Sequence, residues 1–374
     1  MSLAHARTSW SDIREPGAHL STRKFTEPDP ERLAEAAGLT YTRDTEPGIR
    51  RQRRGRGFSY HAPDGSLLTD PDVKERIHAL AIPPAWTEVW ISCDPEAHIS
   101  ATGRDGEGRK QYIYHPVWRE RRDELKFQRV VEFGRALPHL RMRVGRDLRR
   151  SELSRRKVLA AAVRVLDRTG IRPGSEAYEN ANDSYGLTTL RRKHLRIDGT
   201  CVRLTFEGKG GRPVEVQLTD ESLSGVLRSC NQMPGYRIFQ YLDERGDRRS
   251  ATPEEVNAYI ADALGAGFTS KDFRTWAATV RSLVALASQP EPDPDDQAAL
   301  GEALDAAMEE VAEALGNTAR IAREAYVHPL IVRRFLEGGF GKTLAAARRT
   351  ETRYRRPGRL REERLLLAFV DAAP

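Results

Sequence analysis

Residues 201–219 read CVRLTFEGKGGRPVEVQLT, a stretch with the pattern of two strands joined by a glycine-rich turn. Apolar and polar residues alternate from Val202 to Phe206 and again from Val214 to Leu218. Alternation with a period of two is typical of strands with one buried face, and glycines permit the backbone conformations of a tight turn. The stretch therefore predicts a β-hairpin with Lys209 at its tip.

The sequence on both sides of this hairpin has helical periodicity. From about Trp118 onward, apolar residues recur at spacings of three and four, which is the signature of helices with one buried face. After the hairpin we expect helices over these segments: Pro253–Leu264, Phe273–Ala287, Ala298–Leu315, and from Thr318 onward. The stretch Gln289–Asp295, rich in proline and acids, predicts a loop.

The region before Trp118 has a different pattern. Residues 39–115 contain short apolar or alternating runs broken by turn signals such as Pro63-Asp64-Gly65, with one helix expected near Asp70–Leu80. Residues 1–30 are polar and without periodicity, as in a mobile arm. We therefore predict an α+β protein with an arm at 1–30, a mainly β domain at 31–116 and a mainly α domain at 117–374.

The composition fits a globular protein that stays in the cytoplasm. The 374 residues suffice for two domains with real cores, and 39% of them are hydrophobic. The sequence has neither a run of about 18 apolar residues nor an apolar N-terminal signal segment, so no membrane association is expected.

Metal and nucleotide motifs are missing from the sequence. Cys93, Cys201 and Cys230 are odd in number and far apart, and are expected to be reduced core thiols. There is no H-E-x-x-H, and the carboxylates do not gather with histidines or cysteines in a metal-binding pattern, so neither a metal nor another cofactor is expected. Residues 338–343, GGFGKT, end like a P-loop but lack its first glycine and its preceding strand, so no nucleotide is expected either.

Basic residues are clustered along the chain. Lys and Arg outnumber Asp and Glu by 61 to 54, which gives a net charge of +7. The clusters lie at 50–56, 104–122, 141–157, 191–193 and 348–361. A single basic run is most often a solvated face, but several arginine-rich runs among aromatics favour a polyanionic partner, because the guanidinium fork matches phosphate oxygens. Duplex DNA is the expected partner. The protein is expected in the cytoplasm, associated with the nucleoid.

Four residues of the helical region could carry chemistry on a phosphate. Arg172 follows Gly170-Ile171, Lys209 lies at the hairpin tip, Arg274 lies in a helical stretch, and Tyr326 comes nine residues after Asn317. Each also has an ordinary structural interpretation. Lys209 could be a solvated turn lysine, and Arg172, just before Pro173-Gly174, could cap the end of a helix.

In order and spacing, this series resembles the catalytic residues of type IB DNA topoisomerases, and more closely those of the bacterial and poxvirus-like branch. The resemblance runs from about Leu39 to about Leu336. Further matches lie at these positions: Pro83-Pro84-Ala85-Trp86, Gly108-Arg109-Lys110-Gln111-Tyr112, Gly186-Leu187 before Lys193-His194, and Lys271-Asp272-Phe273-Arg274-Thr275.

The resemblance implies a C-shaped clamp around duplex DNA, acting as a monomer and without ATP or metal. Tyr326 would be the nucleophile that forms a 3′-phosphotyrosyl link, Arg172 and Arg274 would stabilise the transition state, and Lys209 would be the general acid. Asn317 departs from the family, where histidine is common. Asparagine can donate a neutral hydrogen bond to a phosphate oxygen but cannot exchange a proton near pH 7. It could also cap the helix that carries Tyr326.

The physical chemistry agrees with these roles. A phenol ionises near pH ~10 in water, so attack at neutral pH requires nearby cations or a proton acceptor. Fixed guanidinium groups can stabilise the charge of a phosphoryl transition state, as a metal does in many nucleases. A lysine beside glycines can approach the departing 5′ oxygen and protonate it.

Further residues are expected at the DNA. These are Arg109, Lys110, Gln111, Tyr112, Lys193 and Lys271. Tyr112 could instead be ordinary strand packing, and we expect core positions for Trp86, Trp90, Tyr185 and Trp276.

Two other functions stay open. A tyrosine recombinase shares arginines, a lysine and a tyrosine, but usually has His-x-x-Arg where this chain has Lys271-Asp272-Phe273-Arg274. The other alternative is a DNA-binding protein on the same scaffold that Asn317 has made inactive.

Overall fold

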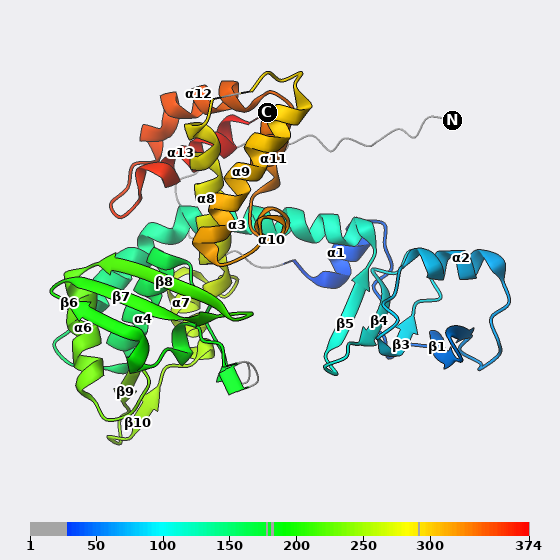
Figure 1. Cartoon of the computed structure of the whole chain (residues 1–374), viewed down its shortest axis with the longest axis horizontal. Coiled ribbons are helices and arrows are strands. Elements are labelled where there is room, and N and C mark those ends of the chain that lie inside the picture. Colours follow the sequence, from blue (N-terminus) through cyan, green and yellow to red (C-terminus); the bar gives the residue numbers. More distant parts are fainter. Residues whose placement is uncertain (1–27, 177–178, 181–182, 291, 374) are drawn as a thin grey trace. The chain divides into compact units, whose positions relative to one another are not determined.

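The computed structural model describes residues 28–176, 179–180, 183–290 and 292–373, and forms two compact units. One unit consists of residues 27–128, and the other contains residues 129–374 (Figure 1). The first is built around an antiparallel sheet and the second is mainly helical, so the expected α+β class is confirmed. Most of the predicted arm at 1–30 lies outside the described residues.

The N-terminal unit is a five-stranded antiparallel sheet with two short helices, α1 (Pro30–Ala36) and α2 (Pro71–Ala79). The strands lie in the order β2-β1-β3-β4-β5. Their bounds are Ile49–Arg54 (β1), Gly57–His61 (β2), Thr87–Ile91 (β3), Ile99–Arg104 (β4) and Lys110–Tyr114 (β5). Ile49, Ile77, Val89 and Ile91 form its main core with Ala101.

The helix expected near Asp70–Leu80 is confirmed as α2, and its start has a local cause. The Asp70 side chain accepts hydrogen bonds from the backbone N–H groups of Asp72 and Val73. Pro71 occupies the first turn, where its missing N–H leaves no helical hydrogen bond unmade.

Helix α3 (Pro116–Leu148) is 33 residues long, and its residues up to Gln128 belong to the N-terminal unit. Its later part packs against α8 (Ser270–Ser288) at Gly134. A Cβ atom at Gly134 would lie 2.1 Å from the ring of Trp276, so only glycine allows this approach. Trp276 is buried there, as the sequence predicted.

The C-terminal unit is mainly helical. Besides α8, its helices are α4 (Arg155–Thr169), α6 (Glu221–Gln232), α7 (Pro253–Leu264), α9 (Gln297–Leu315), α10 (Ala319–Ala325), α11 (Pro329–Leu336), α12 (Phe340–Thr350) and α13 (Arg361–Ala372). The predicted segments match α7, α8 and α9 closely. The helical pattern expected from Thr318 onward is confirmed, as α10, α11, α12 and α13 with short turns between them.

The predicted hairpin is confirmed as β7 (Cys201–Gly208) and β8 (Arg212–Thr219). The two strands pair from Cys201↔Thr219 to Gly208↔Arg212, which leaves Lys209 and two glycines in the turn. Gly210 and Gly211 have φ angles of 74° and 70°, which other residues rarely adopt. Strand β6 (Leu195–Asp198) completes this sheet, and β9 (Gln240–Leu242) pairs with β10 (Arg248–Ser250) in a second one.

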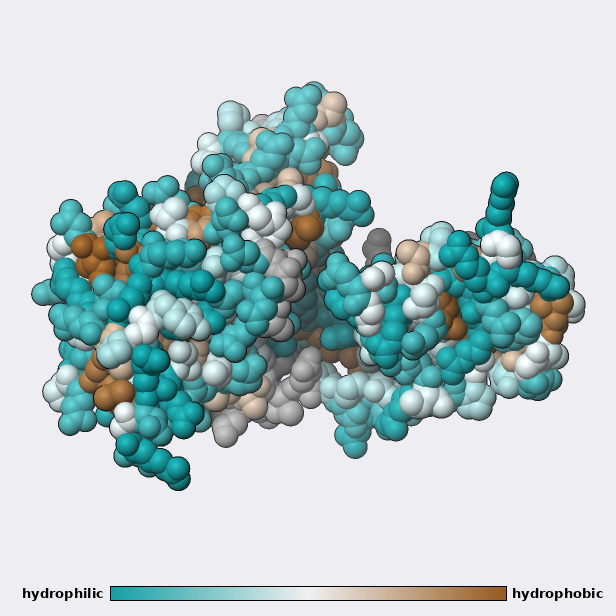
Figure 2. All heavy atoms as spheres, turned by 60° about the horizontal axis from the view of Figure 1, so that its bottom comes forward, coloured by the Kyte–Doolittle hydropathy of each residue, from teal (hydrophilic) through white to brown (hydrophobic). Residues whose placement is uncertain are grey.

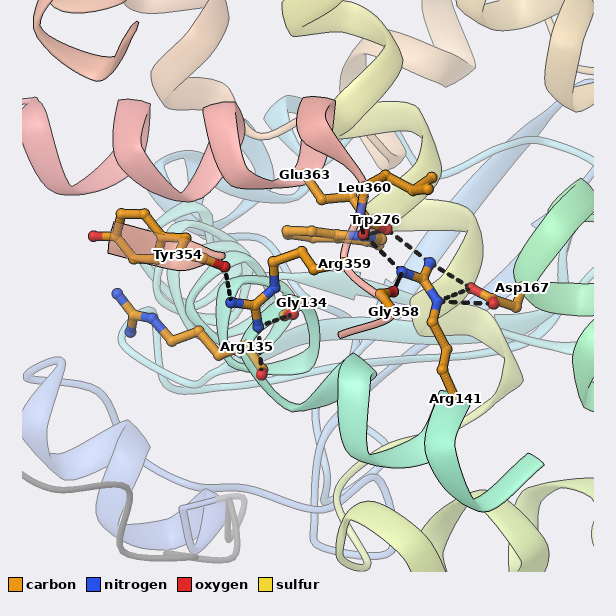
Figure 3. A network of polar contacts seen from close by, with 10 residues as sticks. All are labelled: Gly134, Arg135, Arg141, Asp167, Trp276, Tyr354, Gly358, Arg359, Leu360 and Glu363. Atoms are coloured by element: carbon orange, nitrogen blue, oxygen red, sulfur yellow. Dashed lines mark hydrogen bonds and ion pairs between the residues drawn. The ribbon is translucent and has the colours of Figure 1, made fainter. Parts of the chain in front are cut away.

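A buried polar network ties the last helix to the rest of the C-terminal unit (Figure 3). Arg141 of α3 donates hydrogen bonds to the carboxylates of Asp167 on α4 and Glu363 on α13. Glu363 also accepts from the indole N–H of Trp276 at 3.0 Å and from the backbone N–H of Leu360 at 2.9 Å. The network joins α3, α4, α8 and α13 around one carboxylate.

Two expectations about buried side chains need correction. Only Cys230 is a buried thiol; Cys201 is half-buried and Cys93 is exposed, so the expectation of three core thiols is wrong. Trp90 and Tyr185 are buried as expected, whereas Trp86 is only partly buried against the N-terminal core.

Figure 2 shows a face on which hydrophilic residues predominate and hydrophobic ones form small patches.

No helix among the described residues has both the length and the apolar character needed to cross a membrane. Within the same residues, no group of three or more His, Cys, Asp or Glu side chains is placed to hold a metal ion.

Candidate active site

The five candidate catalytic residues all belong to the C-terminal unit, on segments that are distant in sequence. Arg172 follows α4, Lys209 lies in the β7–β8 turn, Arg274 lies on α8, Asn317 lies between α9 and α10, and Tyr326 directly follows α10. Arg172, Lys209 and Arg274 line one pocket of about 470 Å³. Asn317 and Tyr326 do not line it, but each contacts one of the lining arginines.

Arg274 is held by the ends of two helices. Its guanidinium donates to the backbone oxygen of Gly170 at 2.5 Å and to that of Leu315 at 2.9 Å. These carbonyls belong to the C-terminal turns of α4 and α9, where no further helical N–H is available to satisfy them. A cation at a helix C-terminus is favourable, so these two helix ends fix the guanidinium in place.

Glycine makes this arrangement possible at both helix ends. Gly170 and Gly316 are the residues after α4 and α9, with φ angles of 63° and 60°. This left-handed conformation ends each helix sharply and turns the chain back toward the pocket. The segments that carry Arg172 and Asn317 start at these two turns.

Arg172 joins the two turns. It donates to the side-chain oxygen of Asn317 at 2.5 Å and to the backbone oxygen of Gly316 at 3.4 Å. The alternative interpretation, in which Arg172 caps a helix, is therefore correct in kind, but the helix is α9 and not the one that precedes Arg172 in sequence.

Asn317 does not cap the helix before Tyr326, which corrects that expectation. The side chain of Thr318 does so, because it accepts a hydrogen bond from the N–H of Ile321. Asn317 is buried, with an exposed fraction of 7%, and its side-chain nitrogen is a buried donor without a hydrogen-bond partner among the described residues. An unpaired buried donor costs about 1–3 kcal/mol, so this N–H group favours a ligand that brings an acceptor.

Tyr326 lies at the end of α10, with its ring against Arg274. The guanidinium carbon of Arg274 is 5.3 Å from the ring centroid. The backbone around Tyr326 is tied to α8, because the hydroxyl of Thr279 bonds to the backbone oxygen of Tyr326 at 3.1 Å and accepts from the N–H of His328 at 3.3 Å. His328 then caps α11 through its ring nitrogen. The tyrosine is therefore positioned by the same helix that carries Arg274.

Like charges lie close together in this site. Burial lowers the pKa of Arg274, the neighbouring positive charge of Arg172 lowers it further, and Tyr326 opposes the shift. The pKa of an arginine is so high that the group stays charged at neutral pH. Two guanidinium groups so placed repel each other, and an anion bound near both would relieve the repulsion.

The tip of the β7–β8 hairpin is attached to the turn between α9 and α10. Arg212, the first residue of β8, donates a hydrogen bond to the backbone oxygen of Asn317. This contact links the turn that carries Lys209 to the turn between α9 and α10. The pocket also has acids on its lining, namely Glu215, Glu310 and Glu313.

The residues expected at DNA lie in both units. Residues 109–112 form the end of a turn and strand β5 at one edge of the N-terminal sheet. Arg109 pairs with Asp105 at 2.8 Å and Lys110 with Asp44 at 2.6 Å, and Gln111 also donates to Asp105. Tyr112 is 43% exposed, so it is not packed in the core.

The other two residues expected at DNA, Lys193 and Lys271, are exposed side chains of the C-terminal unit. Lys193 lies 5.5 Å from the ring centroid of Tyr185, which lines the pocket. Lys271 lies in the first turn of α8, three residues before Arg274.

Sequence reasoning missed two supporting residues, Arg212 and Thr279. Arg212 is one of many arginines, and only its position directly after the turn distinguishes it. Thr279 is a threonine inside a helix, and nothing in the sequence shows that its hydroxyl meets a backbone 47 residues away. Their roles depend on long-range contacts.

Two family models match the chain. One is described as "Bacterial DNA topoisomerase IB, N-terminal domain" and matches residues 57–105; the other is described as "Eukaryotic DNA topoisomerase I, catalytic core" and matches residues 115–335. The second match includes all five candidate catalytic positions.

Viral proteins are among the relatives. The DNA topoisomerase 1B of Acanthamoeba polyphaga mimivirus is 32% identical over 286 residues, which cover 75% of this chain and 85% of that protein. The DNA topoisomerase 1B of Vaccinia virus (strain Copenhagen) is 23% identical over 233 residues, or 62% of this chain and 70% of that protein. A solved structure of the XerH site-specific recombinase bound to difH substrate, in a pre-cleavage complex, covers 60% of this chain and 56% of that one at 14% identity, but its TM-score of 0.30 carries no argument.

Proposed function

The chain belongs to the type IB DNA topoisomerase family, and on this premise we propose that Tyr326 cleaves one strand of duplex DNA by attacking a phosphodiester. The enzyme is a DNA topoisomerase, and it relaxes supercoils by cutting and resealing one strand. Four more side chains would serve the reaction: Arg172, Lys209, Arg274 and Asn317. The phosphotyrosyl ester keeps the energy of the broken bond, so resealing requires no ATP.

One observation carries these assignments. Two arginines are fixed beside each other at helix ends, and their neighbour Asn317 has a buried N–H without a partner among the described residues. The Nε of Arg274 is likewise buried without a partner there. Such an arrangement costs free energy in the empty protein, through repulsion and unmade hydrogen bonds. A phosphate group supplies both the negative charge and the acceptors, and the charge of its transition state is greater still.

Tyr326 would act from the side of Arg274. The guanidinium near its ring favours the negative charge that the phenol oxygen acquires as its proton leaves. The attack forms a bond from the tyrosine oxygen to phosphorus and breaks the bond from phosphorus to the 5′ oxygen. The products are a 3′-phosphotyrosyl strand and a strand that ends in a 5′ hydroxyl.

Lys209 would give a proton to the departing 5′ oxygen and take it back during resealing. Its turn contains two glycines and lines the pocket shared with Arg172 and Arg274. The hydrogen bond of Arg212 to the backbone of Asn317 supports this role, since it attaches the turn to the phosphate site. An asparagine in place of the common histidine leaves hydrogen bonding, but not proton transfer, to position 317.

The wider expectations stay predictions. They comprise the domain limits at 31–116 and 117–374, the closing of the two domains around duplex DNA, action as a monomer, and a place in the cytoplasm with the nucleoid. The DNA contacts also stay predictions, namely those of Arg109, Lys110, Gln111, Tyr112, Lys193 and Lys271. The ion pairs of Arg109 and Lys110 do not oppose them, because exposed pairs are weak and can be exchanged for phosphates.

The test is relaxation of supercoiled plasmid in EDTA without ATP, with wild type and Tyr326→Phe side by side. We expect wild type alone to relax the plasmid, and both proteins to bind it with the same sensitivity to salt, because the variant lacks only the nucleophilic oxygen. Relaxation by the variant would refute the role of Tyr326. If neither protein relaxes the plasmid or forms a covalent adduct, the alternative of an inactive DNA-binding protein is correct.

A further inference from the structure

The β1–β2 hairpin of the N-terminal unit carries positive charge that its own fold leaves unneutralised. Residues 49–61 read IRRQRRGRGFSYH, with five arginines and no acid. Four of the arginines form no ion pair with any residue of the described chain: Arg50, Arg53, Arg54 and Arg56. All four are exposed. We call this hairpin the arginine ribbon.

The fifth arginine of the hairpin, Arg51, has a structural role within the domain. Arg51 is half-buried, lies 4.1 Å from the ring centroid of Phe58, and donates hydrogen bonds to the backbone oxygens of Ile82, Pro83 and Trp86. Its guanidinium is used fully by the domain itself. The other four have no such function in the fold, so folding alone does not explain them.

The geometry of the ribbon collects donors on one face. Successive residues of a strand point to opposite faces, so Arg50, Gln52 and Arg54 share a face, and the register places Ser59 opposite Gln52. On the other face, Tyr60 packs against the core. At about 3.3 Å per residue, Arg50 and Arg54 lie roughly 13 Å apart along the strand, close to the rise of about four base pairs along the axis of a DNA duplex.

The opposite edge of the sheet differs. There, at β5, the cations of Arg109 and Lys110 are paired with Asp105 and Asp44. At the arginine ribbon, four unpaired guanidinium groups occupy one hairpin and repel each other. No contact within the fold compensates for this repulsion. A polyanion is the ligand that relieves it, and the guanidinium fork matches phosphate oxygens.

We propose that the arginine ribbon is a phosphate-binding surface for duplex DNA, separate from the β5 edge and from the site of cleavage. The proposal rests on the proposed function only in taking DNA as the polyanion. The ribbon binds the sugar–phosphate backbone without reading its sequence, and each neutralised phosphate releases counterions, so binding weakens steeply with salt.

The test compares two triple variants that lose the same charge from the same unit. Arg50→Gln, Arg54→Gln and Arg56→Gln remove the ribbon; the control carries Arg32→Gln, Arg43→Gln and Lys74→Gln, of which Arg43 pairs with Glu31. All are made in the Tyr326→Phe protein, so that no covalent adduct disturbs binding. Affinity for a duplex of about 60 base pairs is measured against salt concentration.

We expect the slope of log affinity against log salt to fall by roughly 2–3 in the ribbon variant, at about 0.9 per lost phosphate contact, and by less than about 1 in the control. Replacing the same three arginines by lysine should restore most of the slope, because the charges remain. Equal slopes in the two glutamine variants would overturn the proposal.

Two further arms identify which DNA the ribbon holds. If it holds the duplex being cut, wild type gains affinity as the duplex lengthens from about 20 to 60 base pairs, and the ribbon variant does not. If it holds a second duplex, wild type captures a labelled duplex on a bead-bound one, and the ribbon variant does not. Either result supports the proposal, whereas no change in both arms overturns it.

A last measurement separates the ribbon from the cleavage site. With Tyr326 present, the ribbon variant should form the covalent adduct on a short duplex at the wild-type rate. Slower adduct formation there would overturn the separation. Failure of Tyr326 as nucleophile would leave the salt slopes unaffected, so the two proposals fail independently.

Discussion

Replacing Glu363 by glutamine should destabilise the C-terminal unit by about 3 kcal/mol, although the two side chains have nearly the same shape. The carboxylate is 5% exposed and accepts four hydrogen bonds. One oxygen accepts from Arg141 and from the indole of Trp276; the other accepts from Arg141 and from the backbone of Leu360. Every partner is a donor.

The magnitude follows from this geometry (Figure 3). A glutamine has one acceptor oxygen, so its NH₂ group must face two of the four donors in either orientation. Each buried donor left unpaired costs about 1–3 kcal/mol. Arg141 keeps its ion pair with Asp167, which limits the loss to about 3 kcal/mol, near the lower end of the ~3–5 kcal/mol for breaking a buried pair.

The assay is urea unfolding of the full chain at pH 7, followed by circular dichroism at 222 nm, because the C-terminal unit contains most of the helix. The matched control is Glu362→Gln, the same change on the neighbouring residue, which is exposed and should lose less than about 0.5 kcal/mol. If the two variants unfold within about 0.5 kcal/mol of each other, the network does not stabilise the unit as argued.

The difference in stability between wild type and Glu363→Gln should depend on pH with a definite sign. Burial alone would raise the pKa of Glu363, but the hydrogen bonds and charge of Arg141 outweigh it and hold the pKa below its ordinary value of 4.5. The stabilisation by the ionised group is therefore fully present above pH 4.5 and is lost as pH falls through the lower folded pKa. The gap between wild type and Glu363→Gln should be constant from pH 8 to 6 and should shrink below about 4.5.

Four other changes have defined outcomes. Asn317→Ala should slow covalent adduct formation by about 10²-fold with unchanged DNA affinity, since one donor to the transition state is lost; a weaker affinity with an unchanged rate would contradict it. Lys209→Ala should slow cleavage by about 10²–10⁴-fold and be rescued by a DNA whose 5′ oxygen is replaced by sulfur, a better leaving group that needs no proton; absence of rescue would exclude the acid role. Arg212→Gln should slow cleavage about tenfold, with the same rescue, because it positions the lysine turn; a loss that sulfur does not reduce would show another role. Burial lowers the pKa of His328 to about 4, so between pH 6.5 and 4 only the unfolded chain binds the proton. Wild type should therefore lose up to about 3 kcal/mol of stability over this range. In acid unfolding, His328→Asn should lose less, because asparagine can still cap the helix but does not titrate.

Much of the fold could be predicted because it depends on local rules. The hairpin at 201–219, the helices α2, α7 and α9 and the mainly β character of the N-terminal unit follow from periodicity, caps and glycines. The helical character from Thr318 onward was also predictable, but its division into α10, α11 and α12 was not, because apolar spacing continues across the turns at Tyr326 and Gly338. Only packing shows where the chain bends. The expected burial of Cys93 was wrong, because residue type alone does not determine whether a residue just after a strand, here β3, is covered by the fold.

The sequence by itself determined the order and spacing of Arg172, Lys209, Arg274 and Tyr326, and with them the family, since these depend on chain position alone. Only the tertiary structure decided how the site is held together. The helix end that Arg172 contacts is 144 residues away, the carbonyls that fix Arg274 belong to two different helices, and the cap before Tyr326 is Thr318 and not Asn317. Which partner satisfies a buried donor is set by packing across the whole unit, because every competing acceptor must first be placed, and no local pattern in the sequence contains that information.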